Sequence, residues 1–166
     1  MKKYVLIMSV LGLFSVQLYA DAIAVIQPTA GHRASGLIRF SQEGDKVRVR
    51  ATLQGLTPGK HGFHIHEYGD ITSADGTSAG GHYNPDHHKH GLPPVHERHA
   101  GSFGNIVADV SGNATLEMLD DTISVSGSFH PIMGRSVVLH VKEDDGSGPA
   151  GNAGARIGVG VIGLCK

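Results

Sequence analysis

Histidine is concentrated in one stretch of this chain, where its spacing suggests metal chemistry. Nine of the 12 histidines lie between His61 and His99, and two of them form the tripeptide His64-Ile65-His66. Residues two apart in an extended strand point to the same face, so both imidazoles would project from one side of a strand. Imidazole suits copper, zinc, iron or nickel, whereas calcium and magnesium prefer oxygen ligands. With His82, His90 and His99 in the Gly/Pro-rich segment that follows, the pattern favours a transition-metal site over a solvated loop.

The N-terminus has the form of a secretory signal peptide. Two lysines precede an apolar run from Tyr4 to Phe14, and Ala20 offers a cleavage point. The run is too short and wrongly flanked for a membrane span, and the alternative is an uncleaved lipid-facing anchor. We therefore predict a signal peptide at 1–20, a mature domain at 21–166, export to the periplasm or the extracellular space, and no membrane attachment after cleavage.

Composition narrows the function further. The 166 residues suit one domain, and without the first 20 the chain carries 12 basic and 15 acidic residues, a formal charge of −3. A nucleic-acid-binding protein would show a basic face, so nucleic acid is not an expected partner. Cys165 is the single cysteine, which excludes an intramolecular disulfide and leaves a free thiol or a bridge between subunits.

The elements that would position the histidines are β-strands. No segment keeps a helical period, and 24 glycines suit many tight turns. The pattern predicts an all-β fold, an eight-stranded antiparallel Greek-key sandwich or barrel with two long functional loops, Gly69–Phe103 and Glu143–Ala155. The candidate strand segments are Ala24–Ile26, Ser35–Ser41, Val47–Leu53, His61–Tyr68, Gly104–Val110, Ala114–Leu119, Thr122–Ser126, Ser136–Val141 and Ile157–Leu164.

Several motifs together resemble one family. The segments HGFHIHEYGD, TSAGGHYNP, KHG, ERHAG, GNIVADVSG, VVLHVKEDD and GNAGARIGVGVIG resemble the copper-zinc superoxide dismutases, in the same order across the mature chain. The resemblance implies a β-sandwich fold, superoxide as substrate, and copper and zinc as cofactors.

The resemblance also implies roles for individual residues. The bridging imidazole shared by both metals would be His82, and the cation that guides superoxide would be Arg156. Asp144 would link one copper histidine to one zinc histidine and fix their rings. The implied copper ligands are His64, His66, His82 and His140, and the implied zinc ligands are His82, His90 and His99.

One departure from the family concerns zinc. Ser102 stands where the family has an aspartate as the fourth zinc ligand. A serine hydroxyl is a poor zinc ligand, so we expect a weakly held or incomplete site, completed by water or a nearby loop residue. The other candidates in sequence are Asp86, His87, His88 and His96, which could equally belong to a solvated loop.

Two further departures affect the loops. The positions of the family's disulfide are occupied by Gly76 and Val159, and a disulfide closing a long loop typically contributes about 2–4 kcal/mol. We therefore expect the first long loop to be less constrained. The loop between His140 and Arg156 is shorter than in most family members and lacks their cluster of charges, so attraction of the anion should fall mainly to Arg156.

The predicted function is that of an exported, copper-dependent superoxide dismutase with antioxidant activity and an atypical zinc site. The alternative is an exported copper-binding or copper-buffering protein on the same fold, and a purely structural sandwich module is a weaker third reading. Arg156 favours the enzyme, because a buffer does not need a guide for anions. Two segments, Ile132–Arg135 and Gly160–Leu164, resemble the family's dimer contacts and predict a homodimer.

Overall fold

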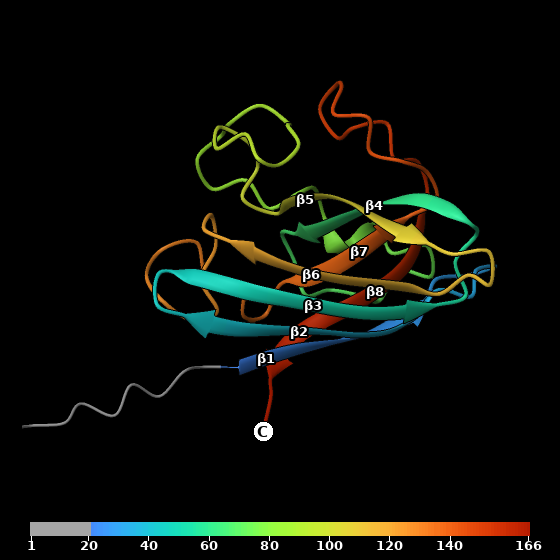
Figure 1. Ribbon diagram of the computed structural model, residues 1–166, viewed down its shortest axis with the longest axis horizontal. Helices are drawn as coiled ribbons and strands as arrows, with labels where there is room; N and C mark the ends of the chain where they lie inside the picture. The colour runs from blue at the N-terminus through green and yellow to red at the C-terminus, as the bar shows by residue number, and fades with distance from the viewer. Residues whose placement is uncertain (1–20) are drawn as a thin grey trace, which may run out of the picture.

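The computed structural model describes residues 21–166, which form eight antiparallel strands closed into a barrel (Figure 1). The predicted signal peptide at 1–20 lies outside the described residues, so it stays a prediction. The strands are β1 Asp21–Pro28, β2 Ser35–Glu43, β3 Lys46–Gln54, β4 Gly59–His66, β5 Ser102–Ala108, β6 Ala114–Asp120, β7 Ser136–His140 and β8 Arg156–Leu164, with a short 3₁₀ helix η1 at Thr77–Ala79.

The strand order around the barrel is β1-β2-β3-β6-β5-β4-β7-β8. Strand β3 pairs with β6 and strand β4 pairs with both β5 and β7, so the chain crosses between neighbours in the Greek-key manner. The predicted fold class is confirmed. No helix among the described residues is long and apolar enough to cross a bilayer.

One predicted strand is wrong. The segment Thr122–Ser126 forms no strand; its ordered pairing is a single isolated bridge between Ser124 and Pro131. The side chain of Gln42 occupies the place of a ladder partner, since its Oε1 accepts a hydrogen bond from the backbone N–H of Val125 at 2.8 Å. Because a side chain takes the place of a neighbouring strand on one side, the segment is held as a loop and does not extend into a strand.

The barrel interior is filled by alternate residues, and the pattern changes at the two strands nearest the histidines. Strand β3 alternates buried and exposed positions along its length, as expected for a strand with one solvated face. Strands β4 and β7 are buried on both faces: Phe63 and Leu139 belong to the core, whereas His64 and His140 point to the other face and are also buried. Long loops must therefore cover the outer face of this pair.

Two long connections provide that cover. The chain between β4 and β5 and the chain between β7 and β8 rise from the same side of the barrel, drawn in green to yellow and in red (Figure 1). Both predicted functional loops are thus present. Register irregularities interrupt β4 between Gly62 and His64 and β7 between Leu139 and His140, and such bulges commonly re-aim side chains beside active sites.

The first long loop is fixed to the barrel without a disulfide. Val159 packs with Ala79, Val138 and Ile71 in a small apolar cluster between the loop and strands β7 and β8. Arg156 donates hydrogen bonds to the carbonyl oxygens of Gly76 and Gly80, at 2.6 Å each. Packing and charge-assisted hydrogen bonds therefore hold the loop to the barrel, and the expectation that the loop is less constrained than in the family stays a prediction.

Candidate metal centre

Two groups of imidazoles meet under the long loops. The ring nitrogens of His64, His66, His82 and His140 lie within 4.8 Å of one another, and those of His82, His90 and His99 form a second group within the same limit. The strand register explains the first group, because β4 and β7 are adjacent and His64 pairs with Val138. An isolated bridge between His66 and His82 brings in the third ring.

Three rings of the first group are oriented by hydrogen bonds on their far side. His64 donates from Nε2 to Asp144 Oδ2 at 2.7 Å, His66 from Nδ1 to the carbonyl of Gly80, and His140 from Nδ1 to the carbonyl of Gly154, the last two at 3.0 Å. A neutral imidazole that donates from one nitrogen keeps a lone pair on the other. Each ring therefore presents a bare nitrogen to the others.

These bare nitrogens have no satisfactory protein partner. His64 Nδ1 and His82 Nε2 are buried and make no hydrogen bond, and the Nε2 atoms of His66 and His140 face each other at 3.4 Å as two acceptors. Buried lone pairs without donors are unfavourable and call for a cation. The donor set, four imidazole nitrogens, suits copper.

His82 belongs to both groups and can serve both metals. Its Nε2 faces the first group, whereas its Nδ1 lies 3.4 Å from His99 Nδ1 and 3.4 Å from Ser102 Oγ in the second. The opposite nitrogens of one ring thus point into two adjoining sites, which is the arrangement of a bridging ligand.

Asp144 connects the two groups from behind. Its Oδ2 accepts from His64 Nε2 and its Oδ1 accepts from His90 Nε2 at 2.9 Å, with the carboxylate fully buried. Burial alone would raise the pKa of Asp144, but the hydrogen bonds from His64 and His90 outweigh it and lower the pKa to about 2. The residue is therefore a carboxylate at neutral pH and fixes the tautomer of both rings.

Burial keeps the rings neutral, as metal ligands must be. It is the largest influence on the pKa of His66 and of His82 and lowers both well below the ordinary value for histidine. The pKa of His140 is lowered to about 4, again mainly by burial. A neutral imidazole binds one metal ion without losing a proton, so the other rings are ready to bind metal at neutral pH, whereas His82 would have to release its N–H to bridge two ions.

Arg156 lies on β8, the strand next to His140 of the first group. It pairs with His140 between β7 and β8, and its positive charge contributes to lowering the pKa of both His66 and His140. Its guanidinium is half-buried and held by Gly76 and Gly80. A fixed cation beside the metal ligands can attract and orient an anion.

The remaining loop histidines lie outside both groups. His88 contacts the carbonyl of Arg98, His96 is exposed beside Asp121, and Asp86 accepts a hydrogen bond from His130. His87 is exposed in a left-handed conformation. None of these residues belongs to a metal-ligating group of the described chain, whereas Ser102 lies against His82 and His90.

Several residues with positioning roles were not found from the sequence. Asn105 donates from Nδ2 to the backbone carbonyl of Asp144 and accepts from its N–H, which fixes the carboxylate. The two ring nitrogens of His61 lie against the carbonyl oxygens of Thr57 and His140, both at 2.8 Å. No motif distinguishes these residues from ordinary polar strand positions.

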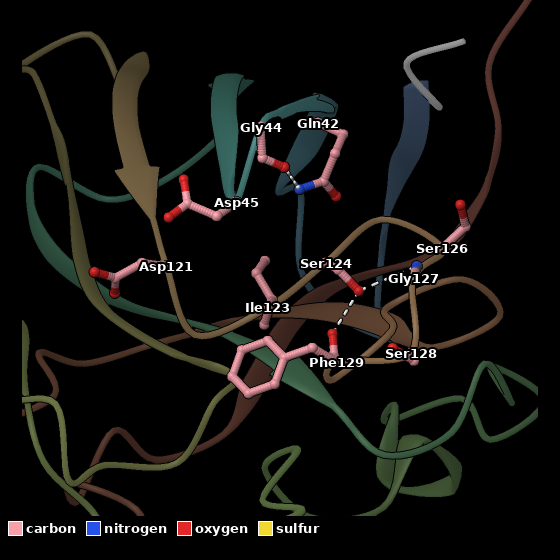
Figure 2. Close-up of a pocket in the computed structure, with 10 residues that line it drawn as sticks. All are labelled: Gln42, Gly44, Asp45, Asp121, Ile123, Ser124, Ser126, Gly127, Ser128 and Phe129. Carbon is pink, nitrogen blue, oxygen red and sulfur yellow. Dashed lines mark hydrogen bonds between the residues drawn. The ribbon is translucent and has the colours of Figure 1, made fainter. Parts of the chain in front are cut away.

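A pocket of about 520 Å³ lies elsewhere, between the turn after β2 and the loop after β6 (Figure 2). Ser124 bonds the backbone of Gly127 and Phe129 there, and Gln42 bonds the carbonyl of Gly44. No histidine of the described chain lines it, and His96, which lies beside the pocket residue Asp121, belongs to neither metal-ligating group. The pocket is therefore separate from the metal-binding groups.

The fold and the paired sites define a β-barrel metalloprotein with two adjoining imidazole centres. The family model described as copper/zinc superoxide dismutase (SODC) matches residues 34–162. The chain belongs to the copper/zinc superoxide dismutase family, whose members use copper and zinc.

Individual relatives agree with this assignment. The extracellular superoxide dismutase [Cu-Zn] of Brugia pahangi is 39% identical over 155 residues, covering 87% of this chain and 76% of that protein. The protein of the same name from Caenorhabditis elegans is 46% identical over 138 residues, covering 79% of this chain and 62% of its own length. A crystal structure of the clock protein EA4 matches with a TM-score of 0.81 and 42% identity, covering 89% of this chain and 96% of that one.

Proposed function

We propose that this protein is a superoxide dismutase that converts superoxide to oxygen and hydrogen peroxide, with copper at the four-histidine group and zinc at the adjoining group. The observation that carries the proposal is the convergence of ring nitrogens in two adjoining groups. Two of these nitrogens, His64 Nδ1 and His82 Nε2, are buried and have no hydrogen-bond partner. Membership of the family and the names of the two nematode relatives support it.

Copper supplies the electron exchange with two superoxide anions in turn, which zinc cannot do. The side chains supply the rest. Arg156 attracts and orients the anion beside His66 and His140. His82 Nε2 faces the copper group without a protein partner, so it can accept a proton and return it to the product. Asp144 and the carbonyls of Gly80 and Gly154 hold the other rings in fixed tautomers throughout.

A direct test is the rate of superoxide loss after pulse radiolysis, measured on metal-loaded protein. We expect a rate far above that of free copper, decreasing with ionic strength because a fixed cation attracts the anion. Replacing His64 by alanine should abolish activity, and replacing the exposed His96 by alanine should not. A rate equal to free copper, with copper tightly bound, would instead support the copper-buffering alternative.

Export is the proposed cellular setting. The apolar segment at 1–20 has the pattern of a signal peptide, and both nematode relatives are named extracellular. N-terminal sequencing of the protein secreted by an expressing cell should begin at Asp21. Retention of the first 20 residues in a cell-associated form would contradict the proposed cleavage.

A homodimer is the proposed assembly. Apolar side chains are exposed together on the outer surface of the paired strands β1 and β8 and on the segment beside them. They are Val25, Tyr68, Val161 and Leu164. Gly69 lies close to both Gly134 and Val161, so these segments are contiguous. Light scattering should give twice the chain mass, Val161→Lys should reduce it to one chain mass, and Val107→Lys, at an exposed valine of β5, should not.

A further inference from the structure

Ser102 is buried against the second group of imidazoles. Its side chain has no exposed surface, and its Oγ lies 3.4 Å from His82 Nδ1 and 3.3 Å from His90 Nδ1. In the same group, His82 Nδ1 lies 3.4 Å from His99 Nδ1. The hydroxyl oxygen therefore lies against two of the three ring nitrogens, and the third, on His99, lies against His82.

The spacing of these atoms matches tetrahedral zinc. Zinc binds imidazole nitrogen at about 2.0–2.1 Å, and the edge of a regular tetrahedron is about 1.63 times the distance from centre to corner. The expected separation between two ligands is therefore about 3.3–3.4 Å. The three separations given above, from Ser102 Oγ to His82 Nδ1, from Ser102 Oγ to His90 Nδ1 and from His82 Nδ1 to His99 Nδ1, agree with this value.

The backbone holds Ser102 in this position. Its N–H donates to the carbonyl of His99 at 2.9 Å, and its carbonyl accepts from Arg98 Nε at 3.0 Å. Arg98 is in turn paired with Asp120 in the interior. A ligand held by its own main chain needs little reordering when an ion binds.

No carboxylate of the described residues belongs to the group of His82, His90 and His99. Asp144 contacts His90 through Nε2, on the far side of the ring from Ser102, and the metal-ligating group that contains His90 has no aspartate or glutamate among the described residues. The hydroxyl and the rings of His90 and His99 are neutral, so apart from the His82 ring shared with the first group, the direct ligands carry no negative charge. Asp144 compensates the charge of the ion only through the ring of His90.

We propose that Ser102 is the fourth ligand of the second metal site, through its Oγ, giving a zinc site of three imidazoles and one hydroxyl without a coordinated carboxylate. The inference deepens the proposed function and rests on it for the identity of the metal. Its consequence is a site that keeps tetrahedral geometry but binds zinc reversibly, more weakly than a carboxylate-completed site would.

Cobalt(II) substitution with Ser102→Cys tests the ligand directly. A thiolate at position 102 should give the near-ultraviolet sulfur-to-cobalt charge-transfer band of a coordinated cysteine, because thiolate is a good ligand for this type of site. The parent protein contains Cys165, which lies outside the group, and should give no such band. Cobalt bound to the variant without a charge-transfer band would overturn the proposal.

Zinc affinity provides the second measurement, by competition with a chromophoric chelator and with copper already bound. Ser102→Ala should weaken zinc binding by about tenfold or more, and Ser102→Asp should strengthen it by a similar factor. Ser136→Ala is the matched control, since Ser136 is equally buried but bonds the carbonyl of Tyr68. Equal zinc affinity for the parent and Ser102→Ala, or no zinc binding by the parent, would refute the role of Ser102.

The two proposals can fail separately. If the four-histidine group binds copper without dismutation, the proposed function is wrong, whereas the cobalt spectrum of Ser102→Cys still reports the ligand at position 102. If dismutation is fast but the charge-transfer band is missing, the function stands and the serine ligand is excluded.

Discussion

Removing the carboxylate of Asp144 should weaken both metal sites at once, and the zinc site more visibly. In Asp144→Ala, His64 Nε2 and His90 Nε2 lose their common acceptor. Each ring can then move its proton to Nδ1, the nitrogen that faces the metal group, and rotate away from its present orientation. Loss of such a partner typically costs 10–100-fold in metal affinity, about 1.4–2.7 kcal/mol per site.

The order of metal loss follows from the ligand sets. With His64 misdirected, the copper group still has three imidazoles, whereas with His90 misdirected the zinc group has two imidazoles and the hydroxyl of Ser102. The metal-free protein should also be less stable, because two buried N–H donors left without acceptors cost about 1–3 kcal/mol each. We therefore expect zinc to be lost first as chelator is added, and copper later.

The assay is metal content after dialysis against graded chelator, together with urea unfolding of the metal-free protein. Asp145→Ala is the control, because Asp145 is the adjacent residue, is exposed, and bonds Ser147 rather than an imidazole. Asp144→Ala with both affinities within twofold of the parent would refute the tautomer argument. Copper lost before zinc would refute the argument from ligand number.

Four further predictions concern charge, pH, the cysteine and the loop. Arg156→Ala should lower the superoxide rate constant by about tenfold or more in pulse radiolysis and flatten its salt dependence, and Arg156→Lys should keep part of both. The free energy of unfolding of the metal-free protein should be nearly constant above pH 7 and fall toward pH 4. His140 alone contributes about 3 kcal/mol to the fall, because its folded pKa is about 4 and that of unfolded histidine about 6.5, and the lowered pKa values of His66 and His82 add to it. A flat urea-unfolding profile over this range would contradict the prediction. Cys165 forms no disulfide within the described chain, so the melting temperature should not respond to thiol reductant, and a response would indicate a bridge between subunits. Val159→Ala should cost about 2 kcal/mol in the urea-unfolding assay.

The sequence was informative where function depends on side-chain type and strand period. The alternation around Ile65 predicted that His64 and His66 share a face, and their pairing with β7 agrees. The closed barrel followed from many short strands between glycine turns. The segment Thr122–Ser126 had the same local alternation but pairs only through one isolated bridge to Pro131 and a side chain of β2, so its prediction failed. The alternation of apolar and polar residues alone does not indicate which strand a segment pairs with.

Other parts of the centre had no signal in the sequence. The acceptors that fix His66 and His140 are the carbonyls of Gly80 and Gly154, and every residue has a carbonyl. Their roles come from where the loops cross the strands. The position of Ser102 was visible as a departure from the family, but only the distances from its Oγ to two ring nitrogens turn a missing carboxylate into a candidate ligand.

The same loop crossing explains how the site stays closed without a disulfide. Burying a valine side chain such as Val159 stabilises by about 1.5–3 kcal/mol, and a hydrogen bond from a charged donor by about 1.5–3 kcal/mol. Together with the two bonds from Arg156 to the loop, these contributions are at least as large as the about 2–4 kcal/mol typical of a disulfide. Because Arg156 also carries the charge beside His66 and His140, the residue that tethers the loop is the one that attracts the substrate. Loop order and anion attraction should therefore be lost together in Arg156→Ala, whereas Val159→Ala should loosen the loop and leave the charge in place.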